Sequence, residues 1–362
     1  MPPVEYRILA INPGSTSTKF GVFAGSQAVL VRNLRHSESE MAPFRGRPVL
    51  DQEEFRREAM ERELVTAGED LCGFHAVAGR GGLLGPVRSG TYRVNQPMLD
   101  DLKEARRGEH ASNLGAVLAW AVAARAGVGA FIVDPVSVEE WPERARLSGL
   151  ASIERQSFSH ALNTKAVAKR YAREVGRSYE QLRLIVAHLG SGISISAHEG
   201  GRMIDVADAV SEGPFSAERA GKLPTIELMH LCYSGKHTQE QMEALLRSGS
   251  GIYSYLGTKD LAEVERRIDN GDARASLVFD AMAYQIAKEI GAMATVLLGR
   301  VDAVLITGGM AHSARLIAAV RAAGGWIAPV AVYPGEDELQ ALAEGVLRVL
   351  CGEELAQEYG AT

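Results

Sequence analysis

The 362-residue sequence predicts an α/β protein built from two similar domains. Short apolar strands alternate with longer helical segments, which is typical of layered α/β folds with parallel strand pairing. A strand–turn–strand pattern rich in glycine and hydroxyl residues occurs twice, once around Asn12 and once around His188, about half the chain apart. The length also suits about two domains. Together these observations favour duplicated α/β domains that face one cleft, and a chance similarity of two hairpins is the alternative.

The two hairpins and the helices follow from the residue pattern in order. The first hairpin is predicted from strands at 7–11 and 19–23, and the second from strands at 182–187 and 193–197. Residues 272–298 form the clearest helix, because apolar residues recur there every three to four positions. Other predicted elements are helices at 98–107, 112–126 and 159–175 and a strand at 303–307. Residues 35–62 are charged and weakly patterned, which indicates a surface excursion with a short helix.

Composition excludes several classes of protein. Hydrophobic residues make up 46% and charged residues 23%, so the chain is neither disordered nor a coiled-coil rod. A net charge of −6 gives no support for binding nucleic acid or an anionic membrane. Three cysteines without a CxxC pair indicate neither a disulfide framework nor a zinc site. No signal peptide is recognised, and Arg125 interrupts the most apolar stretch, 114–133, so a cytoplasmic protein is expected.

Three glycine-rich turns could bind a nucleotide. The first combines Gly14 with the hydroxyls of 15–17 and with Lys19, a set that can surround phosphate oxygens although the Walker pattern is absent. The second, at 188–192, and the third, Gly308-Gly309 after a strand, let a ligand approach the backbone closely. The alternatives are a solvated hairpin tip, an ordinary hairpin turn and a tight strand-to-helix turn.

Four ionisable side chains are candidates for chemistry. Arg80 and Arg219 lie in glycine-rich settings, where a guanidinium can bind a carboxylate or phosphate with two parallel bonds. Asp134 ends a predicted strand, and His160 begins a predicted helix. The alternatives are a flexible loop for Arg80, a charged surface turn for Arg219, a cap for Asp134 and a structural role for His160. No HExxH, GxSxG or HRD pattern occurs.

Taken together, these segments resemble the butyrate kinases of the acetokinase family, in order and over nearly the whole chain. The blocks that carry the resemblance are INPGSTSTK (11–19), GRGGLL (79–84), HASNLG (110–115), SHALN (159–163), HLGSGIS (188–194), GPFS (213–216), YLGT (255–258), TGGMA (307–311) and EDEL (336–339). Acetate kinases carry His-Gly-Gly where this chain has Arg80-Gly81-Gly82, and usually Ala at the position of Pro13. Ser191 departs from the butyrate-kinase branch, which commonly has glycine there.

The resemblance implies two actin-like ATPase domains of the ribonuclease H-like fold with a nucleotide cleft between them. Residues 1–155 with 341–362 would bind the acid and phosphate, and residues 156–340 the nucleotide. The implied reaction moves the γ-phosphoryl group of ATP reversibly to butyrate or a related short or branched-chain acid, giving ADP and an acyl phosphate, with Mg²⁺. A homo-oligomer is expected from the family.

The resemblance also implies roles for individual residues. The implied phosphate and metal ligands are Asn12, Gly14, Ser15, Thr16, Ser17 and Lys19, with Asp337 or Glu338 on the metal side. Arg80 and Arg219 would clamp the carboxylate and the phosphoryl group, and His160 would stabilise the transition state. Asp134 would orient an arginine or the metal's water. The implied nucleotide ligands are His188, Gly190, Ser191, Gly192, Gly308 and Gly309.

Other functions remain open at this stage. An acetate or propionate kinase would use the same residues. An actin- or Hsp70-like switch would need the nucleotide turns but no carboxylate clamp. A sugar kinase of the same superfamily would need an aspartate base for a neutral hydroxyl, and Asp134 could serve. A carboxylate acceptor is already ionised at neutral pH, since its reference pKa is near 4, so it needs no base.

Overall fold

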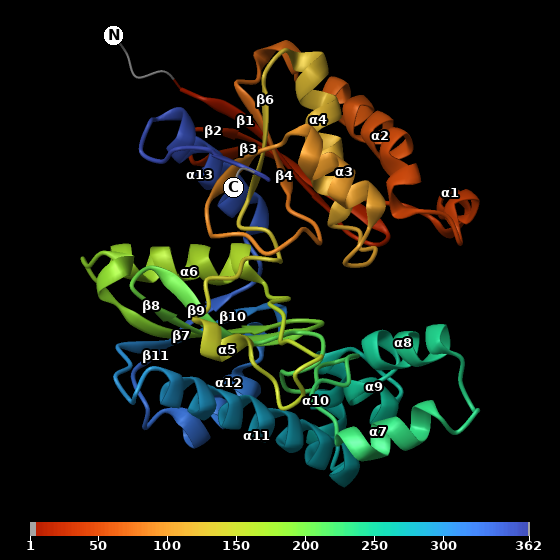
Figure 1. Cartoon of the computed structure of the whole chain (residues 1–362), viewed down its shortest axis with the longest axis vertical. Coiled ribbons are helices and arrows are strands. Elements are labelled where there is room, and N and C mark those ends of the chain that lie inside the picture. Colours follow the sequence, from red (N-terminus) through yellow and green to blue (C-terminus); the bar gives the residue numbers. More distant parts are fainter. Residues whose placement is uncertain (1–4, 361–362) are drawn as a thin grey trace. The chain divides into compact units, whose positions relative to one another are not determined.

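The structure, a computed structural model, describes residues 5–360 and consists of two compact units (Figure 1). The first unit comprises the chain up to Val138 and from Asp337 onward, and the second comprises Glu139–Glu336. Each unit contains one sheet with its own helices.

These boundaries differ from the predicted divisions at 155/156 and 340/341, for physical reasons. In the segment after Val138, the Glu140 carboxylate accepts hydrogen bonds from Lys165 Nζ at 2.6 Å and from Met203 N at 2.9 Å, so the segment packs on the second unit. Near the other boundary, Glu338 contacts Arg80 and so belongs to the first unit.

The sheet of the first unit has seven strands in the order β12-β5-β6-β4-β1-β2-β3. Its strands are β1 (Arg7–Pro13), β2 (Ser17–Ala24), β3 (Gln27–Arg35), β4 (Ala76–Arg80), β5 (Thr91–Arg93), β6 (Gly129–Val133) and β12 (Gln357–Glu358). The five-stranded sheet of the second unit has the order β11-β10-β7-β8-β9. Its strands are β7 (Arg183–Leu189), β8 (Ile193–Glu199), β9 (Arg202–Ala207), β10 (Ala303–Gly308) and β11 (Val330–Pro334).

The two sheets share one topology. In each, three consecutive strands pair antiparallel, and the first of them pairs parallel with a later strand. That later strand, β4 or β10, pairs parallel with β6 or β11 on its other side. The order β3-β2-β1-β4-β6 thus matches β9-β8-β7-β10-β11, with β5 and β12 added to the first sheet. This match supports the predicted duplication.

Helices cover both faces of each sheet (Figure 1). The first unit has α1 (Glu38–Met41), α2 (Glu53–Thr66), α3 (Gln96–Glu104), α4 (Asn113–Ala126) and α13 (Glu338–Leu350). The second unit has α5 (Glu143–Arg146), α6 (Ala161–Glu174), α7 (Thr225–Cys232), α8 (Gln239–Ser248), α9 (Gly251–Leu256), α10 (Leu261–Asp269), α11 (Ala273–Val296) and α12 (Ala314–Gly324). In the part of the chain that the structure describes, no helix combines the length and the apolar character needed to cross a bilayer.

One covering helix of each unit follows the last core strand of the other unit in the sequence. Helix α6 comes after β6 but packs on β7 and β10 of the second sheet, whereas α13 comes after β11 but packs on β1 and β4 of the first. The chain therefore passes from the second unit back to the first between Glu336 and Asp337.

The segment 35–62 is not the surface excursion that the sequence predicts. Helix α2 has fourteen residues, and its Arg56, Met60 and Leu64 are fully buried against the first sheet and α4. The three residues are spaced four apart and so lie on one helix face. The pattern is hard to recognise in the sequence because one of its three positions is an arginine.

This assignment predicts a specific stability difference. Leu64→Ala removes a fully buried side chain from the core of the first unit, and we expect it to lower the free energy of unfolding by about 2–5 kcal/mol. Val65→Ala is the matched control, because Val65 is 73% exposed and should change stability by less than about 0.5 kcal/mol. Urea denaturation followed by circular dichroism measures both. Equal effects of the two substitutions would contradict a core position for α2.

Candidate active site

In the first unit, three predicted residues meet at the carboxyl ends of parallel strands. Asn12 lies near the end of β1 and Arg80 at the end of its parallel neighbour β4, so both reach the same edge of the sheet. Arg80 Nη1 donates to Glu338 Oε2 at 2.7 Å and to Asn12 Oδ1 at 3.2 Å, and Asn12 Nδ2 also donates to Glu338 Oε2. The structure thus joins residues 12, 80 and 338 in one cluster.

Glu338, rather than Asp337, is the carboxylate of this cluster. Glu338 is in the first turn of α13 and is only 4% exposed, so its charge depends on Arg80 for compensation. Asp337 is the residue just before the helix and makes no side-chain capping bond there. Arg80 Nε is buried and has no hydrogen-bond partner among the described residues.

The hydroxyl-rich loop forms the turn between β1 and β2, as predicted. Ser15 and Thr16 are exposed at its tip, and Gly14 N donates to Ser17 O at 2.8 Å to close the turn. Lys19 lies directly across the sheet from Asn12, so the two side chains share one face. The loop therefore presents hydroxyls and a cation beside the Arg80 cluster.

Asp134 makes the contacts of a turn-binding residue. Its Oδ1 accepts from Ser89 Oγ at 2.6 Å and from Gly90 N at 2.8 Å, and it has a left-handed backbone with φ of 39°. Such a conformation is strained in a residue other than glycine. No arginine among the described residues hydrogen-bonds to Asp134, so the contacts are those of the capping alternative.

In the second unit, two predicted histidines stack on each other. His160 precedes α6 and His188 lies near the end of β7, and their rings are 3.7 Å apart at an interplanar angle of 11°. Ser194 Oγ lies 2.9 Å from His160 Nδ1, and Asn163 Oδ1 lies 2.8 Å from His188 Nδ1. The sequence assigned no role to Asn163 or Ser194, although both lie inside the blocks noted above.

Asn163 and Glu336 face the two ring nitrogens of His188. Asn163 Oδ1 can only accept, so His188 Nδ1 carries a hydrogen. His188 Nε2 is buried and lies 3.1 Å from Glu336 Oε1, but the alignment is not that of a hydrogen bond.

Arg219 lies beside the turn after β7. Its Nη1 donates to Ala209 O at 3.0 Å, and a Cβ atom on Gly192 would come within 2.5 Å of that nitrogen, so Gly192 leaves the space that Arg219 occupies. Burial lowers the pKa of Arg219, with Glu218 acting in the opposite direction. Arg219 therefore does not lie in an exposed surface turn, which was the alternative interpretation of its sequence.

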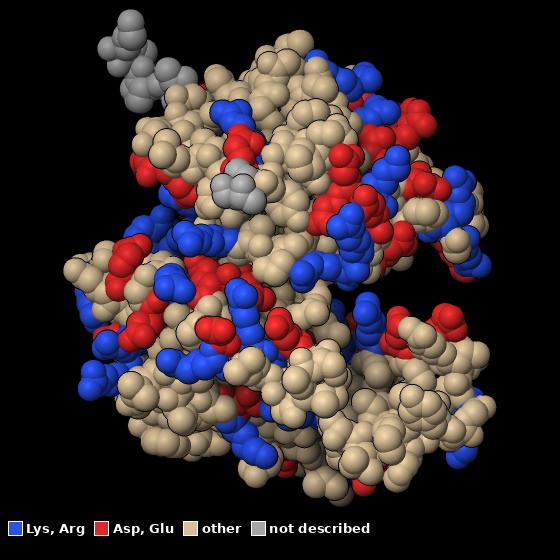
Figure 2. Space-filling view, viewed as in Figure 1, with Lys and Arg blue, Asp and Glu red and all other residues tan. Residues whose placement is uncertain are grey.

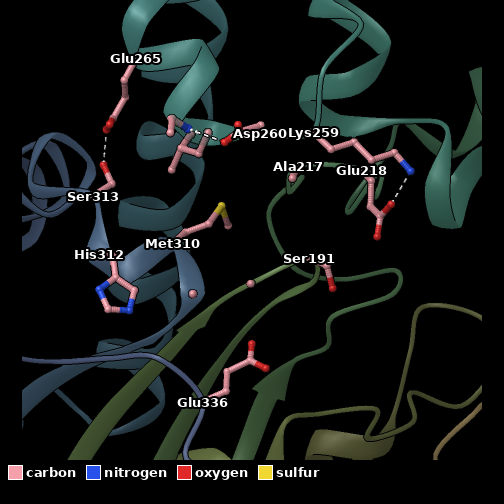
Figure 3. Close-up of a pocket in the computed structure, with 14 residues that line it drawn as sticks. Ser191, Ala217, Glu218, Lys259, Asp260, Glu265, Met310, His312, Ser313 and Glu336 are labelled. Carbon is pink, nitrogen blue, oxygen red and sulfur yellow. Dashed lines mark hydrogen bonds and ion pairs between the residues drawn. The ribbon is translucent and has the colours of Figure 1, made fainter. Parts of the chain in front are cut away.

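A pocket of about 580 Å³ lies wholly within the second unit (Figure 3). Gly190 and Ser191 from the turn after β7 line it together with Gly309 and Met310 from the turn after β10. The structure thus joins the two predicted glycine-rich turns. Further lining residues are Ala217, Glu218, Lys259, Asp260, Leu261, Ala262, Glu265, His312, Ser313 and Glu336. This volume is within the usual range for small-molecule sites.

Polar contacts fix much of the pocket wall (Figure 3). Glu265 accepts from Ser313 Oγ, and Glu218 accepts from Lys259 Nζ at 2.5 Å. Gly308 lies just outside, with φ of 93°, and a Cβ there would be 2.4 Å from Leu189 O. Only glycine therefore allows β7 and β10 to approach this closely at the pocket's edge.

A magnesium ion fits the first unit's cluster in donor chemistry. Mg²⁺ prefers one or two carboxylates together with phosphate oxygens and water, and Asn12 and Glu338 supply an amide and a carboxylate oxygen. Within residues 5–360, no three or more His, Cys, Asp or Glu side chains gather as a metal site. The cluster therefore suits an ion that arrives with a phosphate group.

Lys and Arg side chains are intermixed with Asp and Glu on the face shown in Figure 2.

Cys72, Cys232 and Cys351 are exposed and form no disulfide.

Comparison with solved structures shows the fold class. An acetate kinase from Porphyromonas gingivalis aligns with a TM-score of 0.79 at 20% identity, over 95% of this chain and 100% of that one. A propionate kinase from Francisella tularensis subsp. tularensis SCHU S4 aligns with a TM-score of 0.75 at 18% identity, over 94% and 98%. A ROK family protein from Streptococcus pneumoniae TIGR4 in complex with sucrose reaches 0.52 at 11% identity, over 96% and 100%. The α/β fold with duplicated actin-like domains is thereby confirmed.

A comparison with family models gives a narrower assignment. Residues 151–324 match the model of the acetokinase family. The matched segment contains the stacked histidines, Arg219 and the pocket.

The close approach at Gly308 predicts the effect of a single methyl group. Gly308→Ala should lower the free energy of unfolding by at least about 1–3 kcal/mol and weaken ADP binding, because the Cβ meets Leu189 O and φ is unfavourable. Gly309→Ala is the control for stability, since nothing lies within 4 Å of its added Cβ. Thermal unfolding and calorimetric ADP titration measure both. An unchanged melting temperature in Gly308→Ala would contradict the packing described here.

Proposed function

We propose that the chain is an ATP-dependent carboxylate kinase that phosphorylates butyrate or a related short or branched-chain acid. One observation carries the proposal: two stacked histidines and a half-buried arginine lie at the glycine-rich turn that lines a pocket of about 580 Å³, inside the segment that matches the acetokinase family. Phosphoryl transfer needs alignment and neutralisation of charge on the phosphoryl oxygens, which such donors supply.

The acceptor in this proposal is an ionised carboxylate. It needs no general base, and the chain's best candidate for a base, Asp134, is held by Ser89 and Gly90. A sugar hydroxyl would need that base. The contacts of Asp134 therefore favour a carboxylate kinase over a sugar kinase of the same fold.

Each unit is assigned part of the work. In the first unit, Arg80 binds the acceptor carboxylate, and the loop with Asn12, Ser15, Ser17 and Lys19 binds phosphate. Asn12 and Glu338 would hold Mg²⁺, which neutralises phosphate charge when bound. In the second unit, the pocket holds the nucleoside, His188 contacts a phosphate, and His160 and Arg219 donate to the transferring group.

A longer acid than acetate is favoured by the sequence around Arg80. The Arg80-Gly81-Gly82 block resembles butyrate kinases, whereas acetate kinases carry His-Gly-Gly there. Each buried CH₂ contributes only about 0.8 kcal/mol, so the preference among acids should be graded. Acetate and propionate are the alternative acceptors.

A coupled assay tests the proposal. Purified protein with MgATP is given acids of two to six carbons, and hydroxylamine traps the acyl phosphate as a hydroxamate. We expect product with at least one acid and the highest kcat/KM with four-carbon or branched acids. Reactions without ATP, and the Arg219→Ala variant, are the controls. ATP hydrolysis without hydroxamate from any acid would contradict a carboxylate kinase, and a preference for acetate would correct the acceptor.

The role of His160 can be separated from that of a base. If its ring donates to phosphoryl oxygens, His160→Gln keeps a donor and should retain clearly more kcat than His160→Ala, which should lose about 10²–10³-fold. KM for ATP should change little in both. A general base would instead give equal, near-total losses and a wild-type pH–rate profile controlled by a group with a pKa near 6.5. Measuring kcat from about pH 5.5 to about 8.5 decides between them.

A further inference from the structure

Arg56 is a fully buried cation beneath the hydroxyl-rich loop. It lies on α2, and its guanidinium makes five hydrogen bonds, as many as it has N–H donors. Nε and Nη2 donate to Gln52 Oε1 at 3.0 and 2.8 Å, Nη2 to Ser15 O at 2.9 Å, and Nη1 to Ser17 O at 2.7 Å and to Thr18 Oγ1 at 3.1 Å. Every acceptor is a neutral oxygen.

These bonds turn the loop's carbonyl groups inward. Ser15 O and Ser17 O accept from Arg56, and Thr16 O accepts from His36 N at 2.9 Å. The N–H groups of Ser15 and Thr16 have no acceptor within the described residues, and both residues are exposed. Successive unpaired N–H groups at an exposed turn are suited to binding an anion.

The charge of Arg56 is not compensated nearby. Among residues 5–360, no carboxylate forms an ion pair or a hydrogen bond with its guanidinium. Burial lowers the pKa of Arg56 to about 10, which leaves it charged at neutral pH. His36, whose Nε2 lies 2.8 Å from Thr18 Oγ1, is kept neutral at that pH because burial and Arg56 lower its pKa. A buried cation with neutral partners attracts an anion more strongly than an exposed one.

We propose that Arg56 is a positioning residue for phosphate binding: it fixes the carbonyl side of loop 14–17 and supplies the buried positive charge behind the loop's exposed N–H groups. This inference rests on the proposed function, in which that loop binds a phosphate group. Arg56 itself does not touch the substrate.

Gln52 allows the charge to be tested without removing Arg56. Gln52→Glu keeps an acceptor for the same two N–H groups and converts the contact into an ion pair, which cancels the charge. Gln52→Met keeps the charge but removes the acceptor. If the role of Arg56 is purely structural, Gln52→Met should be the more harmful substitution. If the role is electrostatic, Gln52→Glu should weaken anion binding more than Gln52→Met does.

The measurements are KM for ATP, kcat, and the affinity for inorganic pyrophosphate by calorimetry, on the full chain. We expect Gln52→Glu to raise KM for ATP and to weaken pyrophosphate binding about tenfold, with kcat nearly unchanged. Gln52→Met should stay within about twofold of wild type in both affinities but melt at a lower temperature. Gln27→Glu, at the opposite end of the β2–β3 hairpin, is the control for an added surface charge.

Gln52→Glu with wild-type pyrophosphate affinity, or Gln52→Met with an equal or larger loss, would overturn the inference. If the wild-type protein forms hydroxamate and a Gln52 variant gives either of these results, only the role of Arg56 is contradicted. Wild-type protein that forms no hydroxamate contradicts the proposed function instead.

Discussion

Burial of both faces of each sheet is the constraint on which the rest of the structure depends. Along β7, Leu184 and Val186 pack on the α6 side, whereas Ile185 and Ala187 pack against the core that contains α11 and α12. A central strand that is apolar on both faces needs helices on both sides. In each unit, one of these helices comes from the part of the chain that follows the core strands of the other unit. The chain must therefore pass between the two units twice.

The second passage of the chain between the units also positions one carboxylate in each unit. Glu336, the last residue of the second unit, lies beside His188, and Glu338, near the start of α13, pairs with Arg80. Two carboxylates separated by one residue therefore face Arg80 in the first unit and His188 in the second. The pair of Arg80 and Glu338 is poorly solvated, and groups held firmly in such surroundings need little reorganisation when a phosphate group arrives, which is the condition for strong electrostatic stabilisation.

The sequence predicts the fold well because its strands and helices carry clear periodicity. The predicted helix at 272–298 corresponds to Ala273–Val296, and the two hairpins are where the pattern indicates. It predicts the candidate site less well, since contacts such as Asn163 with His188 depend on tertiary packing. Arg56 was missed because a charged residue at a core position interrupts the apolar pattern of α2. To choose between Asp337 and Glu338, one must know the residue at which α13 begins. Sequence periodicity locates that residue only to within a few positions.

The path of the chain has a consequence for the order in which the units can form during synthesis. The second unit is one continuous segment and has all its residues once Glu336 is made. The first unit is not complete until α13 is made, because Leu339, Leu342 and Val346 of that helix are buried on its sheet. The first unit is therefore begun first and completed last during synthesis. Until α13 is made, one apolar face of β1 stays uncovered. A chaperone that shields exposed apolar strands would find its substrate in the first unit.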